Sequence, residues 1–182
     1  MTNPSTQDQI PEILVTGLGW LGGAHRSLAL VLQDVINRAQ QSLDITAYSI
    51  TSEADEVLAA INDKAAQGVN VRMIIDNLEA DKDDEKSRTR KARLRTVLRE
   101  MMRVNPQTLR IWNFPHESNN DGLHAKVLVA DRSHAVIGSA NLSFRGFQGA
   151  HELGVLVHGE TARQTSKCID KLIISNKTTV WS

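Results

Sequence analysis

His124 and Lys126 have the most suggestive chemistry in the chain, because they lie two positions apart in an apolar stretch. We expect residues 123–130 to form a β-strand. Successive side chains of a strand point to opposite faces, so this pair would share one face about 7 Å apart. An imidazole that is neutral near pH 7 can attack phosphorus and form a phosphohistidine. A neighbouring lysine can hold the same phosphate, so the residue types of this pair are suited to covalent chemistry on a phosphoryl group.

The residues that follow carry the groups that such a displacement needs. Lys126, the Ser139 hydroxyl and the Asn141 amide can donate hydrogen bonds to the non-bridging oxygens, where negative charge accumulates during attack. The Glu152 carboxylate can accept the second ring N–H of the histidine, which would set its tautomer and stabilise the imidazolium. Asp131, at the expected end of the strand, is interpreted as a structural anchor rather than as a reacting group.

The spacing H-x-K-x4-D, followed by GSAN at residues 138–141, resembles the motif of the phospholipase D superfamily. The similarity continues in GSANLSFRGF and HELGVLV downstream and in RAQQSLDITAYSIT upstream, and it covers residues 28–157. The family often has an asparagine two positions before the glutamate, where this chain has Ala150. The resemblance implies an α/β fold, with a mixed sheet flanked by helices, and a metal-independent phosphodiesterase without a cofactor.

The chain carries one copy of the motif, since no other histidine has a lysine two positions later. In the resembling family a second copy supplies the acid that protonates the leaving oxygen. The resemblance therefore implies a homodimer, in which an isologous interface brings two copies of the motif into one shared pocket. The remaining histidines are expected to have no special role. No metal site is expected, because neither H-x3-H nor H-E-x2-H spacing occurs.

Hydrophobic periodicity indicates the elements that position these residues. Apolar residues alternate at 42–50 and recur at helical spacing at 57–66, before an apolar run at 69–76. A helix between two strands favours parallel pairing, so these segments predict a βαβ unit. Further strands are expected at 12–16, 109–114, 135–138 and 151–157, and further helices at 27–39, 94–102 and 161–174. We predict a single domain over residues 12–182, after a flexible N-terminal tail at 1–11.

The charge distribution is uneven, although the chain has 21 basic and 21 acidic residues. Residues 86–103 hold eight basic residues and one acid, a local net charge of +7, and the rest of the chain therefore carries −7. Four of these cations share one flank of the expected helix: Arg88, Lys91, Arg95 and Arg99. We interpret this basic ridge as a nucleic-acid-binding surface, with a solvated helix face as the alternative. The four acids at residues 81–85 are expected to form a solvated loop, with a segment that covers the ridge as the alternative.

Gly17, Gly19 and Gly22 follow an apolar run and precede a helix, as the glycines of dinucleotide-binding loops do. However, the acid expected at the end of the second strand is missing, and no Walker lysine follows the glycines. We therefore expect residues 17–23 to form a flexible loop near the mouth of the site, with a loop that binds a nucleotide phosphate as the alternative. Trp20 in this loop could stack on a base, or pack in a core or an interface.

These observations favour a nuclease that cleaves DNA or RNA. Phospholipases and phospholipid synthases of the resembling family usually carry two motifs in a longer chain, and no membrane-binding helix is evident here. Small single-motif members also serve phage-defence systems, which by analogy implies antiviral defence with an ATPase or helicase partner. The alternatives are a phospholipid hydrolase or phosphatidyltransferase, and a catalytically idle nucleic-acid-binding subunit of a defence complex. A single cysteine, Cys168, and the lack of a secretory signal favour the cytoplasm.

Overall fold

The structure is a computed structural model, and it describes residues 10–17, 20, 25–51, 54–79, 85–118, 121–143 and 150–182. Most of the expected N-terminal tail, residues 1–9, lies outside the described residues. No helix within these ranges is both long and apolar enough to cross a membrane.

A nine-stranded mixed sheet forms the centre of the fold, in the order β2-β1-β8-β7-β6-β3-β4-β5-β9. Its strands are β1 (Glu12–Thr16), β2 (Arg26–Ser27), β3 (Ser42–Ala47), β4 (Asn70–Asp76), β5 (Leu109–Phe114), β6 (Lys126–Ala130), β7 (His134–Gly138), β8 (Glu152–His158) and β9 (Thr179–Trp181). Strands β3, β4 and β5 are parallel to one another, whereas β3, β6, β7 and β8 are antiparallel to their neighbours in that order.

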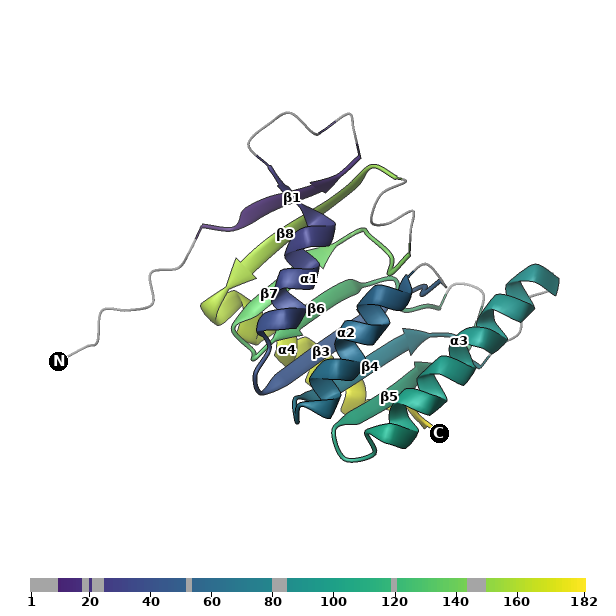
Figure 1. The fold of residues 1–182 in the computed structure, drawn as a ribbon. Helices are drawn as coiled ribbons and strands as arrows, with labels where there is room; N and C mark the ends of the chain where they lie inside the picture. Colours follow the sequence, from purple (N-terminus) through teal and green to yellow (C-terminus); the bar gives the residue numbers. More distant parts are fainter. Residues whose placement is uncertain are drawn as a thin grey trace.

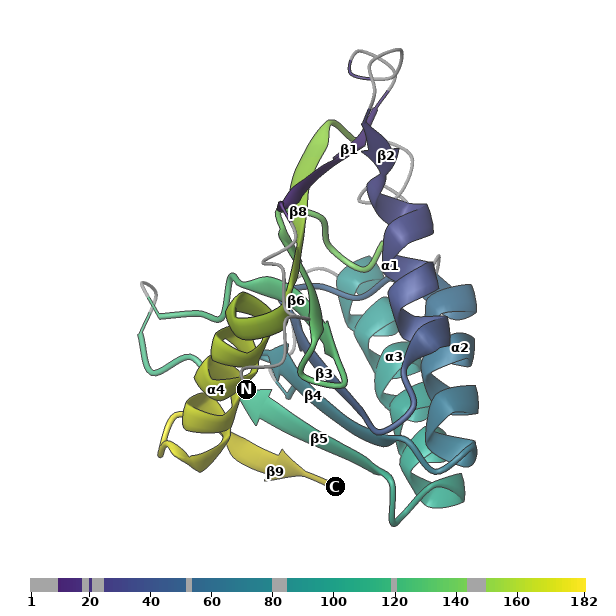
Figure 2. The ribbon, with the colours of Figure 1, turned by 90° about the vertical axis from the view of Figure 1, so that its left-hand side faces the viewer.

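Helices cover both faces of the sheet. Three of them, α1 (Leu28–Arg38), α2 (Asp55–Ala66) and α3 (Glu85–Val104), pack on one face, and α4 (Gly159–Ile174) packs on the other (Figures 1 and 2). One apolar cluster fills each interface between sheet and helices. The predicted α/β fold, a mixed sheet flanked by helices, is therefore confirmed.

The first helix shows how the sequence pattern produces this layer. The Ser27 hydroxyl accepts a hydrogen bond from the Leu30 N–H at 3.5 Å, so it caps the start of α1. The residues at helical spacing are all buried against the sheet: Leu28, Val31, Leu32, Val35 and Ile36. This amphipathic face gives α1 its place on the sheet.

The predicted βαβ unit is also confirmed. Strands β3 and β4 pair in parallel from Ser42↔Asn70 to Ala47↔Ile75, and α2 connects them. Gly68 follows α2 with φ of +93°, a conformation that costs glycine little, so the chain can turn directly into β4.

One predicted strand begins later than expected, with a consequence for the site. Strand β6 starts at Lys126 rather than at residue 123, so His124 precedes the strand. The preceding segment is bound by side chains of neighbouring strands instead of by a ladder. The Leu123 N–H donates to Asp76 at 2.7 Å, and the Thr46 hydroxyl donates to the Ala125 carbonyl at 3.1 Å. The predicted start of this strand at residue 123 was therefore wrong by three residues.

Two strands were missed by sequence reasoning because they are short and weakly patterned. Strand β2 has two residues, and β9 has three at the far edge of the sheet, where it pairs with β5. Their pairing partners are distant in sequence, so local periodicity could not indicate them.

The strand directions gather the candidate functional residues at one end of the sheet. The carboxyl ends of β3, β4, β5 and β7 lie at this end, together with the amino ends of β6 and β8. In Figure 1 the first part of α3 extends past the end of β4 at the same end. Segments separated by more than 100 residues therefore meet there.

Candidate active site

Lys126 is the first residue of β6 and is only 9% exposed. Its Nζ donates a hydrogen bond to the His124 carbonyl oxygen at 2.6 Å and lies 4.8 Å from the centre of the Tyr48 ring. Burial lowers the pKa of the Lys126 ammonium, and the charges of Glu152 and Asp76 oppose this shift. The ammonium is thus a poorly hydrated cation at the end of the sheet where β6 begins.

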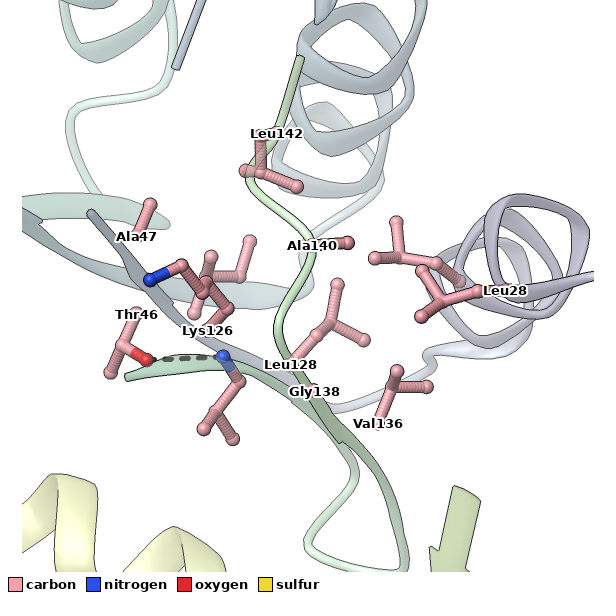
Figure 3. Close-up of a pocket in the computed structure, with 12 residues that line it drawn as sticks. Leu28, Thr46, Ala47, Lys126, Leu128, Val136, Gly138, Ala140 and Leu142 are labelled. Atoms are coloured by element: carbon pink, nitrogen blue, oxygen red, sulfur yellow. Dashed lines mark hydrogen bonds between the residues drawn. The ribbon is translucent and has the colours of Figure 1, made fainter. Parts of the chain in front are cut away.

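The stem of Lys126 runs beside a small apolar cavity between α1 and the sheet (Figure 3). Leu28 of α1 lines this cavity, together with Gly138, Ala140 and Leu142 at and beyond the end of β7. The apolar surroundings hold the lysine stem in place and account for its desolvation.

His124 is exposed, and its ring contacts Tyr48 directly. The two ring centres lie 4.6 Å apart with an interplanar angle of 58°. The Lys126 ammonium lies over the same tyrosine ring. The structure therefore brings His124 and Lys126 together at Tyr48, a residue that the sequence analysis did not select.

Ser139 and Glu152 form a hydrogen-bonded pair at the adjoining ends of β7 and β8. The Ser139 hydroxyl donates to Glu152 Oε2, and the Ser139 N–H donates to the Leu153 carbonyl at 3.0 Å. A Cβ at Gly138 would lie 2.9 Å from that carbonyl oxygen, so glycine permits the close approach of the two strands. Within the described residues Glu152 accepts from Ser139 and not from the ring of His124, which differs from the predicted contact.

Asn141 lies in the segment after β7, which is joined to the segment after β3. The Thr51 N–H donates to the Leu142 carbonyl at 3.0 Å, and Ile50 forms an isolated parallel bridge with Leu142. The side-chain Oδ1 of Asn141 is buried and has no hydrogen-bond partner among the described residues. A buried acceptor without a partner is costly, so this oxygen is suited to accept a hydrogen bond from a bound group.

Asp131 lies at the opposite end of β6 from Lys126, in the turn to β7. Its carboxylate accepts hydrogen bonds from the backbone N–H groups of Gln40, Gln41 and Ser42, the shortest at 2.7 Å. Burial would raise its pKa, but these three donors hold the pKa below the usual 3.8. The carboxylate thus ties this turn to the connection between α1 and β3.

Asp76 and His116 form a pair that sequence reasoning missed. Asp76, the last residue of β4, is 7% exposed and lies 2.8 Å from His116 Nε2 through Oδ1. The same carboxylate accepts from the Leu123 N–H, one residue before His124. An acid at the carboxyl end of a parallel strand is the signal that could have indicated this site, because such ends form ligand crevices.

Most cations of the predicted basic ridge contact other parts of the protein itself. Lys91 donates to the Asn77 carbonyl, and Arg95 donates to the Glu79 carbonyl at 3.0 Å. The Arg99 guanidinium lies 4.9 Å from the centre of the Trp181 ring. Arg88 is exposed. Three of the four cations therefore hold the β4–α3 connection or β9 in place.

The described part of the glycine-rich loop reaches the same end of the sheet. The ring of Trp20 lies 5.8 Å from the ring of His151, next to Glu152. Gly17 has φ of +108°, and a Cβ there would lie 2.8 Å from the His151 ring. Gly19 and Gly22 lie outside the described residues, as do the acids at 81–84. Across the described ranges no three histidine, cysteine or acidic residues group as a metal site would require.

Comparison with known proteins identifies relatives of this chain and of its fold. The family model described as "Cardiolipin synthase, PLD-like domain" matches residues 32–173. DISARM protein DrmC of Bacillus paralicheniformis is 28% identical over 152 residues, which are 83% of this chain and 58% of DrmC. The 5'-3' exonuclease PLD3 of Homo sapiens is 27% identical over 157 residues, which are 85% of this chain and 29% of PLD3. The chain therefore spans less than two thirds of either relative.

Among solved structures, Nuc from Salmonella typhimurium, a phospholipase D family member, is similar with a TM-score of 0.68. The similarity covers 94% of this chain and 99% of Nuc at 18% sequence identity, which shows a shared fold. The family match includes His124, Lys126 and Asp131 and spans most of the chain. The protein therefore belongs to the phospholipase D superfamily, in the family of PLD-like domains.

Proposed function

We propose that this protein is a metal-independent phosphodiesterase that cleaves DNA or RNA. The observation that carries the proposal is that His124 and Lys126 both contact Tyr48. They do so at the end of the sheet where the carboxyl ends of β3, β4, β5 and β7 lie. An exposed imidazole and a partly desolvated ammonium are suited to attack and hold one phosphodiester. The similarity to PLD3, a 5'-3' exonuclease, supports nucleic acid as the substrate class.

The proposed reaction has two steps. A ring nitrogen of His124 attacks phosphorus, an N–P bond forms, and the bond from phosphorus to the leaving oxygen breaks. A second histidine in its imidazolium form gives its proton to the leaving oxygen. Water then attacks phosphorus and gives a proton to that second histidine, while the N–P bond breaks and His124 is restored.

The negative charge of the phosphoryl oxygens is stabilised by nearby donors throughout. Lys126 supplies the positive charge, and the Asn141 amide lies in the adjoining segment after β7. We assign Ser139 and Glu152 to the same site, where their mutual hydrogen bond joins the ends of β7 and β8. Asp131 acts as an anchor and not as a reacting group.

We infer that the second histidine comes from another copy of this chain. Two exposed apolar side chains near the site support a homodimer. Leu153 of β8 is 51% exposed and directly follows Glu152, and Ile13 of β1 is 44% exposed and pairs with Val155 in the middle of β8.

A role in antiviral defence is also part of the proposal. Its support is the similarity to DISARM protein DrmC. The ATPase or helicase partner considered from the sequence remains a prediction, and so do the DNA or RNA preference and the cytoplasmic location.

The decisive experiment is cleavage of a labelled oligonucleotide in excess EDTA. We expect the wild-type protein to cleave it, and the His124→Ala variant to lose at least a thousandfold in kcat/KM, about what loss of a nucleophile costs. His134→Ala is the matched control, because His134 is exposed at the other end of the sheet, at the start of β7. Activity that returns only on addition of a divalent metal would contradict the proposal.

A parallel assay with phosphatidylcholine vesicles separates the alternatives. Turnover of the lipid without oligonucleotide cleavage would identify a phospholipid hydrolase or phosphatidyltransferase, the alternative that the similarity to a cardiolipin synthase family supports. Oligonucleotide binding without cleavage would identify an idle binding subunit.

A further inference from the structure

A cleft of about 220 Å³ lies beside the candidate active site, between the first half of α3 and the segments that follow β3 and β4. Tyr48 and Thr51 line it after β3, Asn77 lines it after β4, and Arg90 and Lys91 line it from α3. Ligands of α/β folds commonly bind outside the carboxyl ends of the parallel strands, and this cleft lies at the carboxyl ends of β3 and β4. This position makes the cleft a candidate binding site.

Tyr48 connects the cleft to the catalytic residues. Tyr48 is 40% exposed, and its ring contacts the ring of His124 and lies beneath the Lys126 ammonium. The same residue forms part of the cleft wall. A polymer with one phosphodiester at His124 must continue on either side of that phosphate. One of these directions leads past Tyr48 into the cleft.

The wall of the cleft that α3 contributes is cationic. Ser87, Arg90, Lys91 and Leu94 line it at positions three and four apart, so they share one face of the helix. Arg90 is exposed and forms no hydrogen bond or ion pair with any described residue. The hydrogen bond from Lys91 to the Asn77 carbonyl holds a second cation at the same wall.

The acidic side chain in the cleft does not cancel this charge on the α3 side. The Asp76 carboxylate is buried and accepts hydrogen bonds from His116 and from the Leu123 N–H. The Asp76 carboxylate is thus paired with groups of the β5–β6 connection and not with the cations of α3. Arg90 is next to Lys91 in the sequence and is exposed in the cleft wall. Its guanidinium is therefore suited to bind an anion.

We propose that the cleft is a subsite for the nucleotide next to the scissile phosphate, in which Arg90 binds the following phosphate of the strand. An aromatic wall combined with a cation for the backbone is the arrangement that single-stranded nucleic acids use. This inference rests on the proposed function, and it specifies the substrate as single-stranded on this side of the scissile bond.

The test measures binding of a fluorescent octathymidylate by anisotropy, with His124→Asn in the full chain to prevent turnover. Adding Arg90→Ala is expected to weaken binding at low salt about tenfold, the usual cost of one charge-assisted hydrogen bond. It should also reduce the slope of log affinity against log salt by about 0.7, the value for one phosphate contact on a single strand. In the active protein, Arg90→Ala should lower kcat/KM more for the octathymidylate than for a thymidine dinucleotide. The dinucleotide has a single phosphodiester, so it has no following phosphate for Arg90 to bind.

Arg103→Ala is the matched control. It removes the same charge from the same helix, but Arg103 lies at the other end of α3 and pairs with Glu100. The salt slope of this variant should equal that of the parent.

The outcomes separate the subsite from the proposed function. Equal salt slopes for Arg90→Ala and Arg103→Ala, in a protein that cleaves the oligonucleotide, would overturn the subsite alone. Binding that depends on Arg90, without cleavage by the active protein, would support the subsite and overturn the nuclease. Tighter binding of duplex than of single-stranded oligonucleotide would overturn the single-strand assignment. Hydrolysis of phospholipid vesicles without oligonucleotide binding would overturn both proposals.

Discussion

At the scale of single residues, Lys126 has a structural role through its apolar stem and a proposed chemical role through its ammonium. Its stem lies beside an apolar cavity, while its ammonium reaches Tyr48 and the backbone of His124. Water solvates this ammonium poorly, so its attraction to a phosphate is stronger than that of a surface lysine. The same desolvation makes it easier to deprotonate.

The pH dependence of the reaction follows from the direction of this shift. Burial lowers the pKa of Lys126 from its usual 10.5, so its charge is lost at a lower pH than that of a free lysine. We expect kcat/KM to fall on the alkaline side with a midpoint below 10.5. In the Lys126→Arg variant this alkaline decrease should disappear, because a guanidinium keeps its proton, even if the rate is lower.

Rate measurements over the alkaline range for the two proteins check this. An alkaline decrease that is identical in the wild type and in Lys126→Arg would show that another group titrates.

At the scale of elements, α3 has two different halves. Leu98 and Met101 of its second half are buried in the core, and Arg99 of the same half lies over Trp181 of β9. The first half extends past the end of β4, where it forms one wall of the cleft (Figure 1). Stability is therefore concentrated in one half, and the proposed substrate contact in the other.

Removal of Arg95 and Arg99 together tests this division. Arg95 holds the Glu79 carbonyl and Arg99 lies on the Trp181 ring, so Arg95→Ala with Arg99→Ala should lower the free energy of unfolding by about 1–2 kcal/mol. Urea denaturation measures the change. The control is Lys86→Ala with Arg90→Ala, which removes the same charge from the exposed start of α3.

The salt slope of oligonucleotide binding distinguishes the two uses of these cations. The sequence predicts that Arg95 and Arg99 also contact phosphates, so the slope should fall in the same double variant. An unfolding midpoint equal to that of the control pair would contradict the structural role.

At the scale of the whole molecule, every proposed catalytic group lies at one end of the sheet, but these groups include only one motif histidine. We expect a dimer by light scattering. Equal amounts of wild type and His124→Ala, mixed under exchange, should show about a quarter of the wild-type activity, because heterodimers form half of the population and lack one histidine. Simple dilution would leave about half.

The same mixture with His134→Ala in place of His124→Ala controls for effects of exchange itself. A monomer that is fully active would contradict the shared site.

Local patterns in the sequence determined much of this protein. The spacing of His124, Lys126 and Asp131 indicated the superfamily, and periodicity indicated the βαβ unit and most strands and helices. Such signals are readable because motif spacing and amphipathic patterns are properties of neighbouring residues. The position of Asp131 after its strand was likewise evident, although its three backbone partners were not.

Only the tertiary structure decided how these pieces meet. Tyr48, Asp76 and His116 lie at or just beyond the ends of three different strands, so no local pattern connects them with His124. The strand boundary at Lys126 depends on hydrogen bonds from β3 and β4 to residues 123–127. The direction of Arg99 depends on Trp181, which lies 82 positions later in the sequence. In each case the deciding contact joins distant residues, and such contacts exist only once the sheet has formed.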